Sequence, residues 1–255
     1  MSQPQPIRLN KFLAERLGLS RREADEIISA GKVKIDGQTA QLGARVDFSS
    51  KVWYNGNIIP FDTDYLYIAF NKPVGYVCSR RAQGSAPTIY DLLPAKYLQL
   101  KTVGRLDKDS SGLIILTNDG DFAYQMTHPK FHKEKIYEVE LDRSLEPLHQ
   151  QMISDYGIML DDGPSKFTVV ASAGGATGGT PAARRRIPRT VGESVATGPA
   201  ERIYFTVILS EGRNRQIRRT FAALGYRVTA LHRTQFGPYQ LASLAPGKCE
   251  PVTKV

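Results

Sequence analysis

The sequence contains very little cysteine. Two of its 255 residues are cysteines, Cys78 and Cys249, and no Cys-x-x-Cys spacing occurs. A disulfide framework needs several paired cysteines, and a structural zinc site needs clustered cysteine or histidine ligands. Neither is expected, so the fold depends on an ordinary hydrophobic core. The hydrophobic share of 41% is sufficient for such a core.

Long apolar runs are also missing from the sequence. No stretch approaches the ~20 apolar residues that cross a bilayer. The first six residues, Met-Ser-Gln-Pro-Gln-Pro, do not resemble the apolar segment of a signal peptide. We therefore expect no membrane partner, a cytoplasmic location, and a disordered tail at residues 1–6.

Several motifs of common enzyme classes are absent. The sequence has neither the Gly-x-Ser-x-Gly motif of a nucleophilic serine nor a phosphate-binding P-loop. Residues 107–112 imitate the start of a calcium loop, but position twelve is Asn118 where a bidentate glutamate is required. Hydrolase and nucleotide-dependent activities therefore have little support, and no metal is expected.

The charge of the chain is its first positive signal. The formal net charge is +9, and the pI is about 9.5. The excess is uneven, because residues 201–255 carry nine Lys and Arg against three Asp and Glu. Such a surplus suggests a polyanionic partner, first of all RNA or DNA. The alternative is that it serves solubility alone.

The N-terminal region, residues 7–62, is expected to form a small domain of two helices and short strands. Apolar spacing predicts a first helix that ends near Gly18, and Ser20 with Glu23 forms a capping box for a second. A strand follows at 33–35. Basic residues around these helices point to RNA, although a helical hairpin with ordinary surface charge explains the composition equally well. The basic residues of interest are Lys11, Arg21 and Arg22.

The remainder, residues 63–255, mixes strands with fewer helices, which predicts an α+β fold. Strands are expected at 65–70, 113–117, 135–141, 166–170, 203–210 and 226–230, and helices at 121–127, 144–155 and 214–224. Residues 171–200 are rich in Gly, Ala and Arg and are expected to be a flexible basic insertion. This insertion either contacts RNA phosphates or is simply tolerated.

Asp107 is the strongest candidate for chemistry. It ends the segment Gly-Arg-Leu-Asp at 104–107, just before an apolar run typical of a buried strand. A carboxylate that works as a nucleophile or base needs a nearby cation. Arg218 flanks the apolar face of the helix at 214–224 and could reach inward, whereas Arg215 and Arg219 share another face. A basic surface helix that only holds phosphate is an equally good interpretation.

Tyr137 is a second candidate. Strand alternation places it on one face with Lys135, Val139 and Leu141. It is then either an ordinary core aromatic or, beside an active carboxylate, a surface on which a flipped base stacks.

Three segments carry a resemblance to a known family. They are Gly-Arg-Leu-Asp at 104–107, Lys-Ile-Tyr-Glu-Val at 135–139 and Glu-Gly-Arg-Asn-Arg-Gln-Ile-Arg-Arg at 211–219. In this order they resemble a bacterial ribosomal RNA pseudouridine synthase of the branch that includes RsuA, RluB, RluE and RluF. Residues 7–60 resemble the RNA-binding domain first described in ribosomal protein S-four. The resemblance implies a mixed, mainly antiparallel sheet with flanking helices, preceded by a small αL-type RNA-binding domain.

The resemblance also implies roles for individual residues. Asp107 matches the catalytic aspartate, Tyr137 the tyrosine that stacks on the target uracil, and Arg218 the basic residue that pairs with the aspartate. Arg105 matches the arginine that helps to hold the flipped nucleotide, and Ile217 the apolar residue near the base. Further RNA contacts are expected from Arg215, Arg219, Arg21, Arg22 and Lys11.

The implied activity is the site-specific isomerisation of uridine to pseudouridine in ribosomal RNA, with large-subunit RNA weakly favoured. No cofactor is expected, because the product is an isomer of the substrate. A monomer is expected, since one RNA-bound site needs no symmetry. The alternative is a non-catalytic RNA-binding or ribosome-assembly protein on the same fold.

Overall fold

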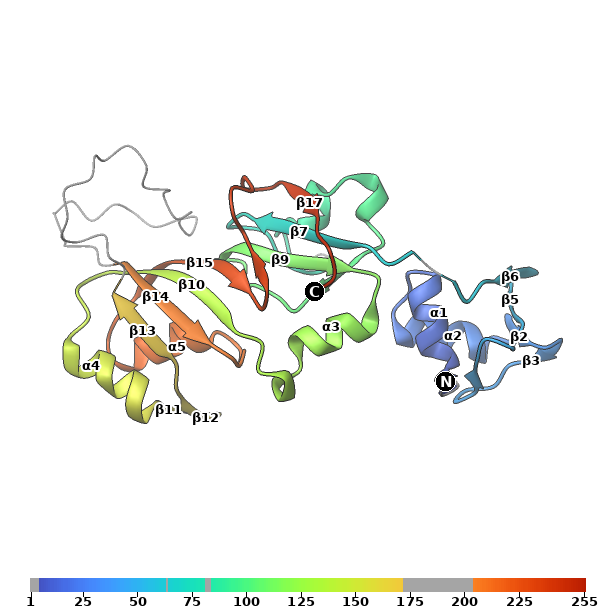
Figure 1. Ribbon diagram of the computed structural model, residues 1–255, viewed down its shortest axis with the longest axis horizontal. Coiled ribbons are helices and arrows are strands. Elements are labelled where there is room, and N and C mark those ends of the chain that lie inside the picture. Colours follow the sequence, from blue (N-terminus) through green and yellow to red (C-terminus); the bar gives the residue numbers. More distant parts are fainter. Residues whose placement is uncertain (1–4, 63, 81–83, 172–203) are drawn as a thin grey trace. The chain divides into compact units, whose positions relative to one another are not determined.

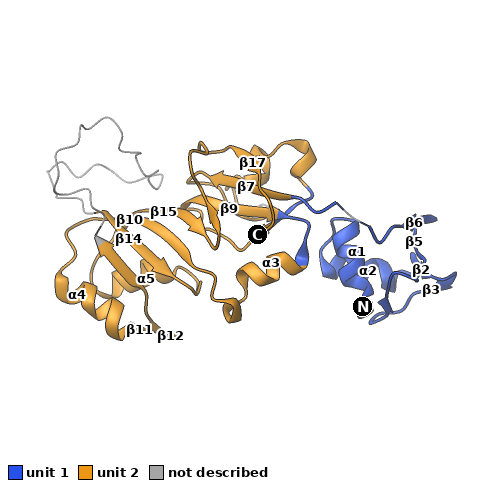
Figure 2. Ribbon diagram, viewed as in Figure 1, with its two compact units in different colours: residues 1–66, 99–101, 117–120 blue, residues 67–98, 102–116, 121–255 orange. Residues whose placement is uncertain are grey.

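The computed structural model describes residues 5–62, 64–80, 84–171 and 204–255. These residues form two compact units (Figure 2). The first comprises residues 1–66, 99–101 and 117–120, and the second residues 67–98, 102–116 and 121–255. Most of the tail expected at 1–6, and all but one residue of the insertion expected at 171–200, lie outside the described residues. No helix of the described part is long and apolar enough to cross a membrane.

The first unit builds a small core from two helices and short strands (Figure 1). α1 (Leu9–Arg16) packs against α2 (Arg21–Ser29), and β1 (Ile7–Arg8) pairs with β4 (Arg45–Val46). An antiparallel sheet has the order β3-β2-β5-β6. Its strands are β2 (Val33–Ile35), β3 (Gln38–Thr39), β5 (Val52–Tyr54) and β6 (Asn57–Ile59).

Local sequence sets the boundaries of the two helices. Gly18 and Gly31 follow them with φ values of +68° each, a backbone conformation that glycine adopts without steric penalty. The capping box that starts α2 is confirmed, because the Ser20 hydroxyl accepts from the Glu23 N–H while the Glu23 carboxylate accepts from the Ser20 N–H. The apolar faces of both helices then bury Phe12 and Ile28 against the sheet.

A nine-stranded sheet organises the second unit (Figure 1). Its main order is β13-β14-β10-β15-β9-β7-β17, with β16 beside β15 and β8 beside β9. β10 is antiparallel to both of its neighbours, and β15 runs parallel to β9. The strands are β7 (Tyr67–Lys72), β8 (Lys101–Val103), β9 (Ser111–Thr117), β10 (Lys135–Leu141), β13 (Thr168–Ala171), β14 (Tyr204–Leu209), β15 (Val228–Phe236), β16 (Tyr239–Gln240) and β17 (Cys249–Pro251).

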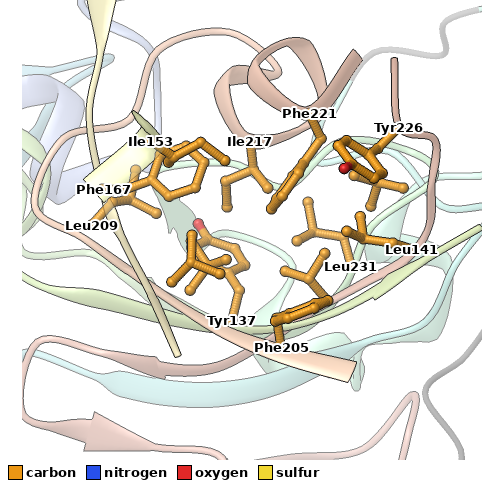
Figure 3. Packing of buried hydrophobic residues seen from close by; sticks show 14 of the residues in the cluster. Tyr137, Leu141, Ile153, Phe167, Phe205, Leu209, Ile217, Phe221, Tyr226 and Leu231 are labelled. Atoms are coloured by element: carbon orange, nitrogen blue, oxygen red, sulfur yellow. The ribbon is translucent and has the colours of Figure 1, made fainter. Parts of the chain in front are cut away.

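Helices cover this sheet and complete its two cores. α5 (Gln216–Ala223) directs Ile217 and Phe221 onto the sheet residues Tyr137, Phe205 and Leu231 (Figure 3). α3 (Gly120–Thr127) closes a second core over β7, β9 and β15. The remaining elements are α4 (Pro147–Gln151), a π-helical turn at Met152–Tyr156, the strand pair β11 (Ile158–Leu160) and β12 (Gly163–Ser165), and 3-10 turns at Ile89–Leu92, Ala95–Tyr97 and Pro129–Phe131.

The predicted α+β class is confirmed, and the predicted strand at 135–141 matches β10 at both ends. Most other predicted elements agree with the structure within two residues at each end, and two differ more. The strand expected at 226–230 is β15, which continues to Phe236. The helix expected at 144–155 starts at Pro147, after the extended Glu146, and changes to π geometry at Met152.

Candidate active site

Asp107 lies in the loop that joins β8 to β9. Gly104 opens this loop with a φ of +70°. The Leu106 N–H donates to the Cys78 Sγ at 3.4 Å, and the Lys108 carbonyl accepts from the Gly75 N–H at 2.7 Å. These bonds attach the loop to the segment that follows β7. The side chain of Asp107 is one-third exposed, so it is held on a fixed loop and still accessible.

Lys72 anchors the end of the same loop from within the core. Its side chain is fully buried, and its Nζ donates to the Ser110 carbonyl at 2.6 Å and to the Pro73 carbonyl at 3.1 Å. Burial lowers the pKa of Lys72 to about 8, against the opposing attraction of Cys78 and Asp107. A cation is thus buried beneath the carboxylate loop and held by two backbone carbonyls.

The loop borders a cleft of about 580 Å³. Five of the sequence-predicted site residues line it together: Arg105, Asp107, Tyr137, Arg215 and Ile217. They come from the β8–β9 loop, from β10 and from the start of α5, segments that are far apart in the sequence. The size lies within the range typical of small-ligand pockets. The sequence therefore identified residues that the fold brings to one place.

One wall of the cleft is formed by β10 and β15. Tyr137 stands directly opposite Arg233 on the neighbouring strand, and Lys135 stands opposite Phe236. The Arg233 guanidinium carbon lies 4.7 Å, and the Lys135 Nζ 5.5 Å, from the centre of the Phe236 ring. Burial, together with the nearby charge of Arg233, lowers the pKa of Lys135 to about 8. This wall combines a tyrosine with two cations.

Arg215 is the cation that the structure pairs with Asp107. Its Nη1 lies 3.7 Å from the Asp107 Oδ2. The same guanidinium donates two hydrogen bonds to the carboxylate of Asp109, each of 2.9 Å. Asp109 thereby holds Arg215 in a bidentate ion pair, which positions the guanidinium charge beside Asp107.

Arg218 reaches inward, as expected, but the acid that it binds there is Asp109. The Arg218 Nε lies 3.3 Å from the Asp109 Oδ2, and Nη2 donates to the Asp109 carbonyl at 2.7 Å. Nη1 donates to the Val228 carbonyl at 2.8 Å. The sequence-based pairing of Arg218 with Asp107 is therefore replaced by Arg215 with Asp107, while Arg218 binds the neighbouring acid.

Backbone conformation explains why Arg215, and not Arg218, lies beside Asp107. The helix expected at 214–224 begins at Gln216, and Arg215 precedes it with a φ of +46°. A left-handed residue lies outside the helical periodicity, so its side chain does not share a face with Arg219 as the sequence suggested. Burial opposes ionisation of Asp109, but hydrogen bonds from Arg215 and the charge of Arg218 outweigh it and lower the pKa of this carboxyl.

Arg219 is not among the residues that line the cleft. Its guanidinium binds the carboxylates of Asp161 and Asp162 near the β11–β12 turn, with one bond of 3.1 Å to the Asp162 Oδ2. Its expected contact with substrate stays a prediction.

The three basic residues predicted for the N-terminal domain belong to the first unit. Arg21 and Arg22 are exposed in the first turn of α2, and Lys11 is half-buried in α1. Their role in RNA binding stays a prediction.

Sequence reasoning missed the importance of Asp109. It was considered there only as part of a possible calcium loop, although it lies two residues from Asp107. Arg215 and Arg218 meet at Asp109 only in the folded protein, so sequence spacing does not show this contact. The one signal in the sequence was the excess of basic residues at 213–219, which indicates that an acidic partner is needed nearby. Lys135 and Arg233 were likewise unassigned as cleft residues.

The arrangement suits a particular class of ligand. An accessible carboxylate stands among the cations Arg105, Lys108, Arg213 and Arg215, next to a tyrosine and to apolar side chains. Cations attract an anionic backbone, and the aromatic and apolar surfaces accept a planar ring. The cleft therefore fits one nucleotide of a nucleic acid, with the carboxylate available for chemistry on it.

Comparison with known proteins identifies the family. A family model described as RNA pseudouridylate synthase matches residues 66–223, and the S4 domain model matches residues 7–58. The chain belongs to the RNA pseudouridylate synthase family, a family of isomerases, and carries an N-terminal S4 domain.

Curated relatives share about a third of their residues with the chain. Ribosomal small subunit pseudouridine synthase A of Pasteurella multocida is 33% identical, with 92% of this chain and 90% of that protein covered. Ribosomal large subunit pseudouridine synthase B of Pseudomonas aeruginosa is 32% identical, with 92% of this chain but 56% of that protein covered. A crystal structure of a pseudouridylate synthase has a TM-score of 0.60 and 30% identity, covering 97% of this chain and 96% of that one.

Proposed function

We propose that this protein converts a specific uridine of ribosomal RNA to pseudouridine. The observation that carries the proposal is the cleft in which Asp107 stands beside Arg215, with Tyr137 and Ile217 lining the same space. Family membership supports the reaction type, and the similar ribosomal pseudouridine synthases support ribosomal RNA as the substrate class. In the reaction the N1–C1′ bond of the nucleotide breaks, the uracil turns, and C5 joins C1′; C5 then loses its proton and N1 gains one, so the product is an isomer of the substrate.

The target nucleotide has to leave its stack before Asp107 can reach the ribose. Extrusion of a base costs a few kcal/mol. Stacking on Tyr137 returns roughly 1–3 kcal/mol of that cost, and Ile217 packs against the base. Arg105 holds the extruded nucleotide by its charge. Contacts of basic side chains with phosphates supply further binding energy that depends on salt.

Asp107 acts on the ribose of the extruded nucleotide. It either attacks C1′ directly or removes the 2′ proton to give a glycal. Both routes require an ionised carboxylate, which a neighbouring cation favours. Arg215 supplies that cation, and Arg218 supports it through Asp109. Arg218→Ala is therefore expected to reduce turnover, because Asp109 would lose one of its two partners.

The ribosomal subunit whose RNA is modified is a further part of the proposal. Large-subunit RNA is the sequence-based preference. Relatives named for the small subunit and for the large subunit match with 33% and 32% identity, so small-subunit RNA is the direct alternative. We propose that residues 7–62 bind the RNA, that residues 63–255 carry out catalysis, and that the protein acts as a cytoplasmic monomer.

The test is product formation on defined RNA. Unmodified transcripts of large-subunit, small-subunit and transfer RNA would be incubated with the protein without added cofactor, digested, and analysed for pseudouridine by mass spectrometry. The proposal predicts product in one ribosomal RNA at one site. Product in transfer RNA alone would contradict the substrate class. Tight binding without product in any RNA would favour a non-catalytic RNA-binding protein.

A further inference from the structure

The solvent face of the four-stranded sheet in the first unit carries an exposed tryptophan, Trp53. In β5, Val52 points into the core and is fully buried, whereas Trp53 is 37% exposed and Ile58 on β6 is 54% exposed. Strand alternation places Trp53 on the face opposite Val52. Trp53 pairs with Lys34 of β2 on one side and with Ile58 on the other. Lys34, Trp53 and Ile58 therefore form a row across three neighbouring strands.

A shallow groove of about 430 Å³ lies along this row. Its lining consists of Lys32, Lys34, Gly37, Trp53, Asn55 and Gly56. A Cβ added at Gly37 or Gly56 would meet nothing within 4 Å, so the rim of the groove is open. The groove thus offers one aromatic surface, two lysines and one amide side chain, with unobstructed access.

The charges around the groove favour an anion. None of the residues that line it is acidic in the described part of the chain. The nearby Asp36 has its Oδ1 engaged by the Lys51 N–H at 2.8 Å. A large exposed aromatic beside cations is the arrangement that binds unpaired nucleotides, because the base stacks on the ring while the cations meet the phosphates. A stacked A-form helix offers no base face for such contact.

We propose that the groove at Trp53 is a binding site for an unpaired nucleotide of RNA. One base stacks on the Trp53 indole, and Lys32 and Lys34 bind the adjacent phosphates. This site lies in the first unit, whereas the cleft at Asp107 belongs to the second. It rests on the proposed binding of RNA by residues 7–62, but it does not depend on the proposed reaction. Its consequence is a preference of the first unit for RNA with single-stranded or bulged residues.

The composition of the chain makes this proposal directly measurable. Trp53 is the single tryptophan among the 255 residues. Tryptophan fluorescence of the complete protein therefore reports on this groove alone. Titration with short single-stranded oligo(A) or oligo(U) is expected to give saturable quenching that weakens as salt is raised. A blunt RNA duplex and inorganic polyphosphate, which present charge without an accessible base, are expected to leave the fluorescence nearly unchanged.

Matched variants separate stacking from general attraction. Lys34→Gln is expected to weaken the quenching titration severalfold, whereas Arg8→Gln on β1, with the same loss of charge, leaves it unchanged. Binding of labelled oligo(A), followed by anisotropy, is expected to weaken about tenfold in Trp53→Leu and to recover in Trp53→Phe. Circular dichroism checks that each variant is folded.

Two results would overturn the proposal. One is oligonucleotide binding that leaves the tryptophan fluorescence unaffected. The other is equal quenching by polyphosphate, duplex and single strand, which would mean that charge alone acts near Trp53. Both results are independent of pseudouridine formation, so failure of this site is distinguishable from failure of the proposed reaction.

Discussion

Asp109 lies where the two arginines of the cleft converge. It accepts two hydrogen bonds from Arg215 and forms an ion pair with Arg218. Its own side chain is 20% exposed. Arg215 in turn lies 3.7 Å from Asp107. The position of the cation beside the reactive carboxylate therefore depends on a second carboxylate that does not line the cleft. Asp109 is a positioning residue in this account.

Asp109→Asn tests that role. The amide keeps the shape of the side chain but removes its charge and one acceptor, so Arg215 is no longer held by two bonds. We expect kcat to fall about 10- to 100-fold with little change in KM. Asp161→Asn is the matched control, because Asp161 pairs with Arg219 and its side chain is 87% exposed. Unchanged kcat in Asp109→Asn, measured by single-turnover kinetics, would refute the positioning role.

Lys72 gives a second prediction at the residue level. Its pKa is lowered to about 8 by burial, while a lysine in the unfolded chain keeps its ordinary value of 10.5. Below about pH 8 the ammonium is charged in both states, so its burial opposes folding in full. Between about pH 8 and 10.5 the folded protein releases this proton and the unfolded chain retains it, so stability rises with pH.

The comparison of wild type with Lys72→Met isolates this effect. Lys72→Met also loses the hydrogen bonds to the Pro73 and Ser110 carbonyls, which changes the unfolding free energy by an amount that does not vary with pH. We expect the unfolding free energy of wild type to rise relative to Lys72→Met by up to about 1.4 kcal/mol per pH unit between pH 8 and 10. Urea unfolding at several pH values measures it. A difference that is flat or falls with pH would contradict the assignment.

The sequence predicted the members of the site better than their pairings. Asp107 and Tyr137 were candidates from the sequence pattern, the family resemblance added Arg105 and Ile217, and the fold places all four on the cleft. The structure places Arg218 against Asp109 and Arg215 beside Asp107, and helical periodicity does not reveal that Arg215 is a left-handed residue in front of the helix. Which of two acids an arginine binds is decided by tertiary geometry that sequence spacing does not contain.

At the level of elements, strongly patterned segments were predicted closely. β10 and β14 agree with expectation within one residue, and α2 has its predicted capping box. β15 was cut short at 230, because its later residues include polar side chains such as His232 and Arg233 that are buried in the sheet. Short strands such as β17 gain their ladder bonds only from a distant partner, so local pattern gave no signal for them.

The parallel pairing of β9 with β15 depends on a glycine. Gly112 pairs with Arg233 and has a φ of +106°. A Cβ at this position would lie 2.2 Å from the Arg233 carbonyl oxygen and 2.5 Å from its nitrogen. No side chain fits there without separation of β9 from β15, and β9 begins directly after the Asp107 loop.

Gly112→Ala is therefore expected to destabilise the second unit by roughly 1–3 kcal/mol or more. Gly84→Ala is the control, because Gly84 also has a positive φ of +62° but no atom within 4 Å of the added Cβ. Thermal or urea unfolding of both variants measures the difference, which reports the steric clash together with the greater backbone strain at a φ of +106°. Equal stability of the two variants would show that the strands separate without cost.

At the scale of the whole molecule, binding and chemistry are assigned to different units. The cleft belongs to the second unit, and the exposed Arg21 and Arg22 belong to the first. With a formal net charge of +9, RNA affinity should fall steeply with salt, because each phosphate that a basic side chain neutralises releases counterions.

Arg21→Gln combined with Arg22→Gln tests this division. We expect weaker RNA binding, with kcat unchanged at saturating RNA. The slope of log K against log salt concentration should become shallower by about 0.7–0.9 for each phosphate that is no longer neutralised. Arg45→Gln with Arg143→Gln removes the same charge from arginines that donate to the Pro6 and Gly225 carbonyls. A salt slope that is equal in the two double variants would contradict RNA binding by α2.

The uridine isomerisation that we propose for this cleft depends on Asp107. The most direct measurement compares wild type with Asp107→Asn for pseudouridine formed in ribosomal RNA transcripts, alongside the affinity of each protein for the same RNA. The account predicts product from wild type, loss of turnover in Asp107→Asn, and RNA affinity that is largely retained. Near-normal turnover by Asp107→Asn would contradict it.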